Sequence, residues 1–78
     1  MKTTLELGRG ISGKDKKSIF ENLNMHETIW NVLVDKELAR VSFDYMTWAD
    51  LQIARRELQE LGYQIINDTH RFDAQNLL

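Results

Sequence analysis

The residues from Gly8 to Lys14 have the types and spacing of a phosphate-binding loop. Their sequence, GRGISGK, nearly matches the pattern G-x-x-x-x-G-K-[ST], in which backbone N–H groups and the lysine hold phosphate oxygens. Asp15 stands where that pattern has a hydroxyl for Mg²⁺, and its negative charge repels phosphate. Ser12 and Asp15 also fit a capping box at the start of a helix. We expect the cap. The alternatives are weak anion binding at the N-terminus of the helix, and an enzyme or nucleotide binder that uses this loop.

Two histidines are candidate metal ligands. His26 lies between Met25 and Glu27 after the first expected helix, and His70 lies near Asp68 after the last expected strand. Both segments fall at the same end of the expected sheet, where two histidines and a carboxylate could bind Zn²⁺ or Cu²⁺. Alternatively, His26 interacts with the negative end of a helix dipole.

Catalytic residues are not evident. The chain has no Cys, which excludes thiolate metal sites, disulfides and thiol nucleophiles. Neither histidine has a serine nucleophile close to it in the sequence. We therefore expect no enzymatic activity and no cofactor.

Three large aromatic residues are candidates for binding a protein partner. Phe20 lies beside the narrow apolar stripe formed by Ile19 and Leu23. Trp30 opens an expected strand, and Trp48 falls in the first turn of an expected helix. Exposed aromatic side chains commonly anchor protein interfaces. The alternative is that the two tryptophans cover the end of a small core.

Alternation, helical spacing and capping signals predict the order strand, helix, strand, strand, helix, strand. The expected strands cover residues 2–7, 29–34, 39–45 and 63–66, and the expected helices run from a Ser12 cap to about residue 24 and from a Thr47 cap to Gly62. Alternation is clearest over residues 39–45, whose apolar residues point to one face. In the second strand, Trp30, Val32 and Val34 are expected to share a face.

These elements predict an α+β, ferredoxin-like βαββαβ sandwich. A four-stranded antiparallel sheet with two amphipathic helices on one face buries both apolar surfaces. The expected domain covers residues 1–67, and residues 68–78 form a polar tail. The second strand is expected at an edge of the sheet, where it could pair with a second copy of the chain.

A set of matching positions covers residues 3–66: Ile19, Leu23, Ile29, Val32, Val34-Asp35, Val41–Tyr45 and Leu58-x-x-Leu61-Gly62-Tyr63. In its spacing the set resembles the heavy-metal-associated domain of copper chaperones and metal-pumping ATPases. The resemblance implies the ferredoxin-like fold. In that family, a Met-x-Cys-x-x-Cys loop between the first strand and helix holds a soft ion such as Cu(I).

The residues at that loop differ in this chain. Gly10 stands at the Met position, and Ser12 and Asp15 stand at the two Cys positions. Neither a hydroxyl nor a carboxylate is a soft donor. The resemblance therefore implies the fold without the thiolate metal site.

Composition sets the remaining expectations. The chain has 78 residues, of which 10 are basic and 12 acidic, so it forms one domain and does not suit general nucleic-acid binding. It has neither a spanning apolar run nor a signal peptide, so we expect a cytoplasmic protein that does not contact a membrane. The predicted function is a non-enzymatic binding or regulatory module for a protein partner. The alternative is a metal-ion carrier that uses His26 and His70.

Overall fold

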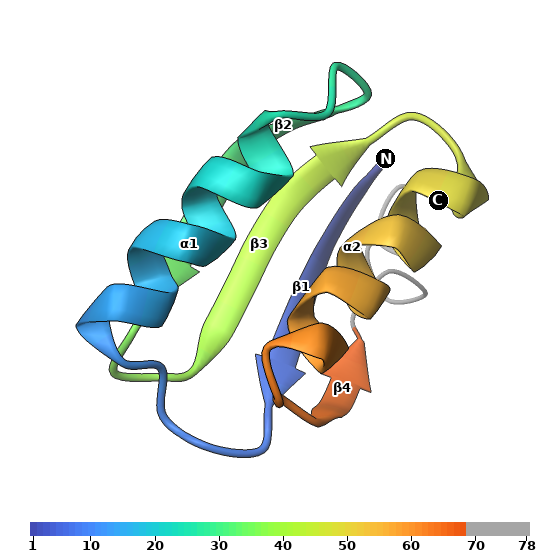
Figure 1. Cartoon of the computed structure of the whole chain (residues 1–78). Coiled ribbons are helices and arrows are strands. Elements are labelled where there is room, and N and C mark those ends of the chain that lie inside the picture. Colours follow the sequence, from blue (N-terminus) through green and yellow to red (C-terminus); the bar gives the residue numbers. More distant parts are fainter. Residues whose placement is uncertain (69–78) are drawn as a thin grey trace.

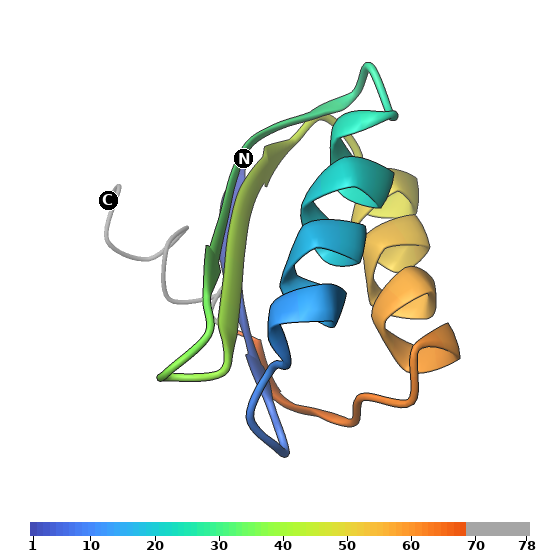
Figure 2. The same cartoon turned by 60° about the vertical axis from the view of Figure 1, so that its left-hand side comes forward.

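The computed structural model describes residues 1–68, which form two helices and four strands. In chain order these are β1 (Lys2–Leu7), α1 (Gly13–Asn24), β2 (Ile29–Asp35), β3 (Arg40–Tyr45), α2 (Trp48–Glu60) and β4 (Ile65–Asp68). The strands form one sheet in the order β2-β3-β1-β4, and each neighbouring pair is antiparallel. Both helices cover the same face of the sheet (Figures 1 and 2). The predicted α+β, ferredoxin-like arrangement is confirmed.

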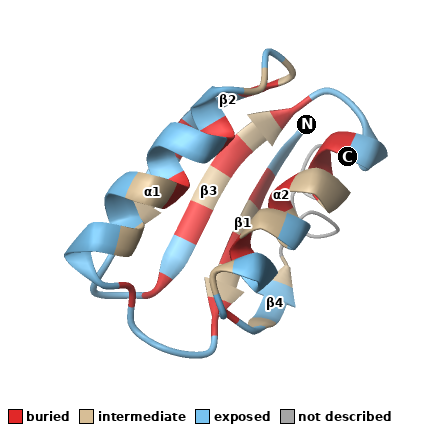
Figure 3. Cartoon of the chain, viewed as in Figure 1, coloured by how far each residue is buried: buried red, intermediate tan, exposed pale blue. Residues whose placement is uncertain are grey.

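The core lies between the sheet and the two helices. Alternate residues of β3 (Val41, Phe43 and Tyr45) are buried, as predicted, beside Leu5 and Leu7 of β1 (Figure 3). The helices add Ile19, Leu23, Leu51, Ala54 and Leu58 to the same cluster. Each leucine, isoleucine, valine or phenylalanine side chain that is fully removed from water contributes about 1.5–3 kcal/mol. No helix within residues 1–68 is long and apolar enough to cross a membrane.

Both helices begin at the predicted caps, but the two caps differ. Thr47 and Asp50 form a complete capping box, since Thr47 Oγ1 accepts from Asp50 N (3.4 Å) and Asp50 Oδ2 accepts from Thr47 N (2.9 Å). The predicted capping box at Ser12 is wrong in one half: Ser12 Oγ accepts from Asp15 N (3.0 Å), but the Asp15 carboxylate accepts from a residue outside the cap and does not reach back to Ser12. Gly62 follows α2, where the helix was predicted to end, and its φ of +90° is the left-handed conformation typical of a glycine at a helix end.

The predicted faces of β2 are wrong for Trp30. Its cross-strand partner is Asp44, whereas Leu33 pairs with Ser42, so three steps along β2 match two steps along β3. Asn31, with a φ of +54°, lies in this bulge. One extra residue reverses the alternation of side chains. Trp30 is therefore exposed, and Ile29 and Val32 are the buried residues of β2.

The last strand begins and ends later than predicted. It covers Ile65–Asp68, while Tyr63 lies buried in the connection that precedes it. Asp68 Oδ1 accepts from Thr3 Oγ1 (2.5 Å), and Asp68 Oδ2 accepts from Arg55 Nη1 (2.8 Å). Asp68 therefore belongs to the folded domain, one residue beyond the predicted boundary. The rest of the predicted tail lies outside the described residues.

Candidate functional site

A groove of about 390 Å³ runs between α1 and β2. Its lining is mostly apolar and consists of Gly13, Lys16, Lys17, Phe20, Val32, Leu33 and Val34. Phe20 keeps 47% of its surface exposed and Leu33 keeps 67%. The groove is thus an apolar hollow beside β2, which is an edge strand of the sheet.

Local structure explains why these side chains gather there. Ile19 and Leu23 point from α1 into the core. Phe20 is one residue, or about 100°, further round the helix, so it lies on the flank of the buried stripe. On β2, beyond the bulge at Asn31, Val32 is buried and Leu33 is exposed. The groove therefore depends on how α1 packs against β2.

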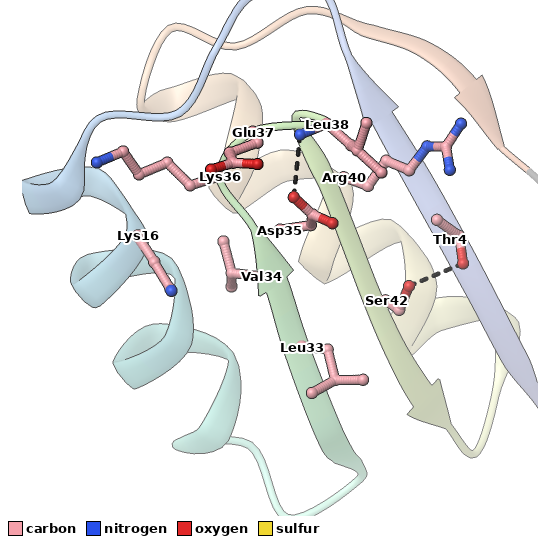
Figure 4. A pocket seen from close by; sticks show the side chains of 10 residues that line it. All are labelled: Thr4, Lys16, Leu33, Val34, Asp35, Lys36, Glu37, Leu38, Arg40 and Ser42. Atoms are coloured by element: carbon pink, nitrogen blue, oxygen red, sulfur yellow. Dashed lines mark hydrogen bonds between the residues drawn. The ribbon is translucent and has the colours of Figure 1, made fainter.

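A second hollow, of about 700 Å³, continues around the same edge. It is lined by Thr4, Lys16, Leu33, Val34, Asp35, Lys36, Glu37, Leu38, Arg40 and Ser42 (Figure 4). Lys16, Leu33 and Val34 line both hollows. We call the continuous region formed by Lys16, Lys17, Phe20, Leu33, Val34 and Lys36 the β2 edge surface.

The charges of the β2 edge surface are mainly positive. Lys16, Lys17 and Lys36 are exposed, and within residues 1–68 none of them forms an ion pair. Asp35 is engaged locally, because its Oδ1 accepts from Leu38 N (3.0 Å) in the β2–β3 hairpin. Glu37 is the other acidic side chain of the second hollow. The lysines therefore remain available to an anionic group on a partner.

The predicted equivalents of the metal-loop cysteines are engaged in the fold. Ser12 caps α1, and the Asp15 carboxylate accepts from Tyr63 Oη (2.5 Å). Burial, followed by the hydrogen bond to Asp15, raises the pKa of Tyr63. The Arg9 guanidinium lies over the Tyr63 ring, 3.9 Å from its centroid. Sequence reasoning anticipated the cap but missed Tyr63, because nothing in the sequence pairs residues so far apart.

The loop from Gly8 to Lys14 does not adopt a glycine-dependent conformation. Among the glycines of the described chain, Gly62 alone has a positive φ. Ile11 is buried and anchors the middle of the loop in the core. Since Ser12 Oγ also accepts from the first turn of α1, the loop resembles a cap more than a phosphate cradle.

The structure places His26 against α2. Its Nε2 lies 2.7 Å from Glu57 Oε1, and both side chains are partly buried. Glu57 Oε2 is buried and has no hydrogen-bond partner among the described residues. In residues 1–68, no group of three or more His, Asp or Glu side chains is arranged to hold a metal ion. The second predicted ligand, His70, lies outside the described residues.

The three predicted partner-binding aromatics occupy different places. Phe20 lines the α1–β2 groove. Trp30, which is 42% exposed, shares the face opposite the helices with Asp44. Trp48, which is 55% exposed, begins α2 and so belongs to the helical layer. Leu33 is the surface residue that sequence reasoning missed as a candidate: the expected shared face of Val32 and Val34 already placed it on the opposite side, where it is exposed.

The β2 edge surface combines apolar side chains with exposed lysines. Its apolar side chains can be buried by a partner, and its lysines can pair with acidic groups. No histidine of the described chain lines either hollow. Comparisons with protein-family models, with curated proteins and with solved structures gave no match to this chain.

Proposed function

We propose that this chain is a non-enzymatic protein-binding module that binds its partner at the β2 edge surface. The observation that carries the proposal is the apolar groove at the sheet edge, where Phe20 and Leu33 remain largely exposed. Covering the exposed part of each side chain would contribute about 1–2 kcal/mol. Such anchors beside a groove are typical of protein interfaces.

The proposal includes a relationship to heavy-metal-associated domains that lack the thiolate site. The βαββαβ order and the helix cap at Ser12 support it. A metal-carrier function has less support. His26 already contacts Glu57, and Ser12 Oγ and Asp15 Oδ2 each accept a hydrogen bond.

Selection from a random peptide library displayed on phage tests the proposed function. Selected peptides should bind the wild-type chain and lose at least tenfold in affinity with Phe20→Ala or Leu33→Ser. Both side chains are exposed, so both variants should remain folded. Trp48→Ala is the matched control, because it removes an aromatic of similar exposure from another element and should leave binding unchanged. Peptides that depend on Trp48 and ignore Phe20 and Leu33 would contradict the proposal.

A further inference from the structure

We infer that the β2 edge surface takes an extended, acidic segment of a partner protein, which adds a strand alongside β2. This inference rests on the proposed function and names the chemistry of the partner. An added strand forms main-chain hydrogen bonds with the sheet edge and places alternate side chains in adjoining pockets. The sheet edge, the groove and the lysines each supply one part of this recognition.

The two edges of the sheet differ in how well they can receive a strand. Within residues 1–68, β2 and β4 each have a neighbour on one side only. β4 has four residues, and its pairing with β1 is irregular near Glu6 and Leu7. β2 has seven residues, and after the bulge its register with β3 is regular from Leu33 to Asp35. The end of β2 that pairs regularly is therefore the better template.

The groove lies where alternate side chains of an added strand would reach. Phe20 rises from α1 on the helical side of β2, and Val32 and Val34 point to the same side. Side chains of an added strand that face the helices would therefore enter an apolar space of about 390 Å³. This space suits β-branched or leucine side chains at every second position.

The lysines of the β2 edge surface favour acidic residues at the remaining positions of the partner segment. Lys16 projects from α1 and Lys36 reaches from the hairpin toward α1, so both lie along the outer side of β2 (Figure 4). Lys17 lines the groove itself. Since none of the three forms an ion pair within the described chain, carboxylates of an extended segment can pair with them.

Three capped synthetic peptides test the inference with the full-length ¹⁵N-labelled chain. The probe is Ac-Glu-Val-Glu-Val-Glu-Val-Glu-NH₂, and the same sequence with Thr or Lys in place of Glu supplies the neutral and basic controls. We expect saturable amide shifts over residues 32–36 and in the first two turns of α1. The acidic peptide should bind at least tenfold more tightly than the basic peptide, and added salt should narrow this difference.

Charge reversal at one lysine gives the matched comparison. Lys16→Glu should weaken binding of the acidic peptide about tenfold and strengthen binding of the basic peptide. Arg56→Glu makes the same charge change on an exposed position of α2 and should alter neither affinity. Equal effects of the two variants would overturn the inference, because the charge would then act at long range and not at this edge.

The outcomes separate this inference from the proposed function. If the neutral and acidic peptides bind the groove equally, the acidic preference is wrong while the binding module stands. If no peptide shifts residues 32–36 but the displayed peptides still depend on Phe20, strand addition is wrong. Sedimentation that shows a stable dimer, with β2 protected in the free chain, would assign the edge to a second copy and overturn the inference.

Discussion

A single carboxylate, that of Asp50, joins the start of α2 to the segment that precedes β2. Its Oδ2 accepts from Thr47 N and Thr47 Oγ1 (2.9 Å each), and its Oδ1 accepts from Thr28 Oγ1 (2.7 Å). These bonds favour the charged carboxylate, so the Thr28 hydroxyl first and Thr47 second lower the pKa of Asp50. The hydrogen bond between Thr28 and Asp50 therefore holds the connection between α1 and β2 against the first turn of α2.

Thr28→Val should raise the pKa of Asp50 toward its ordinary value of about 3.9. In the wild type, a folded pKa below the unfolded one stabilises the fold above about pH 4, and the stabilisation is lost as pH falls through the folded pKa. The variant should therefore lose less stability than the wild type between pH 7 and pH 3. NMR titration of the Asp50 carboxyl carbon and urea unfolding measure the two effects. Thr4→Val is the control, and an unchanged Asp50 titration in Thr28→Val would refute the assignment.

Tyr63→Phe should destabilise the fold by about 1–2 kcal/mol in urea unfolding, because it removes a hydrogen bond to a carboxylate. The ring and its contact with Arg9 remain. The raised pKa of Tyr63 favours the neutral phenol in the folded state. The stabilisation linked to the ionisation of Tyr63 is thus constant below about pH 10 and is lost as pH rises through the folded pKa. Equal stability of the two proteins at pH 7 would show that the Asp15 contact contributes nothing.

At the scale of elements, the sequence predicted the helices and strands that are marked by hydrophobic periodicity and capping residues. β3 alternates strictly because one of its faces is buried, so Val41, Phe43 and Tyr45 were assigned correctly. β2 contains a bulge, and the conformation of Asn31 depends on pairing with β3 rather than on its neighbours in sequence. The prediction for Trp30 failed for that reason. The start of β4 was misplaced because Tyr63 is apolar and buried without being in a strand.

Asn31→Val should destabilise the chain by about 1–2 kcal/mol, because a β-branched residue fits poorly at a φ of +54°. Asn31→Gly accepts this backbone conformation and should stay within about 1 kcal/mol of the wild type. Thermal unfolding of both variants measures the difference. If Val were tolerated as well as Gly, the bulge would not require a left-handed residue.

At the scale of the whole molecule, the buried core and the proposed binding surface use different side chains. A domain of this length is stable by about 4–12 kcal/mol, and its buried cluster supplies most of the hydrophobic contribution. Phe20 could be proposed from the sequence, because it falls outside the Ile19–Leu23 stripe. The groove could not be predicted from the sequence, because it depends on how α1 packs against β2.

Phe20→Ala and Leu51→Ala should separate the two properties. Leu51 is fully buried, so its truncation should cost about 2–5 kcal/mol. Phe20 is half-exposed, and its truncation should cost less than about 1.5 kcal/mol while abolishing tight binding of selected peptides. Urea unfolding and peptide affinity measure the two properties. A loss for Phe20→Ala as large as that for Leu51→Ala would place Phe20 in the core rather than at an interface.

Amide hydrogen exchange of the chain saturated with the acidic peptide tests whether a partner segment adds a strand alongside β2. A strand added to β2 must bond to its outward-facing N–H groups, which alternate along the strand. We predict that exchange slows at least tenfold at alternate residues among 32–36 and stays unchanged in α2 and β4. If the chain is saturated with peptide and β2 gains no protection, or if protection is confined to α2 or β4, strand addition at β2 is contradicted.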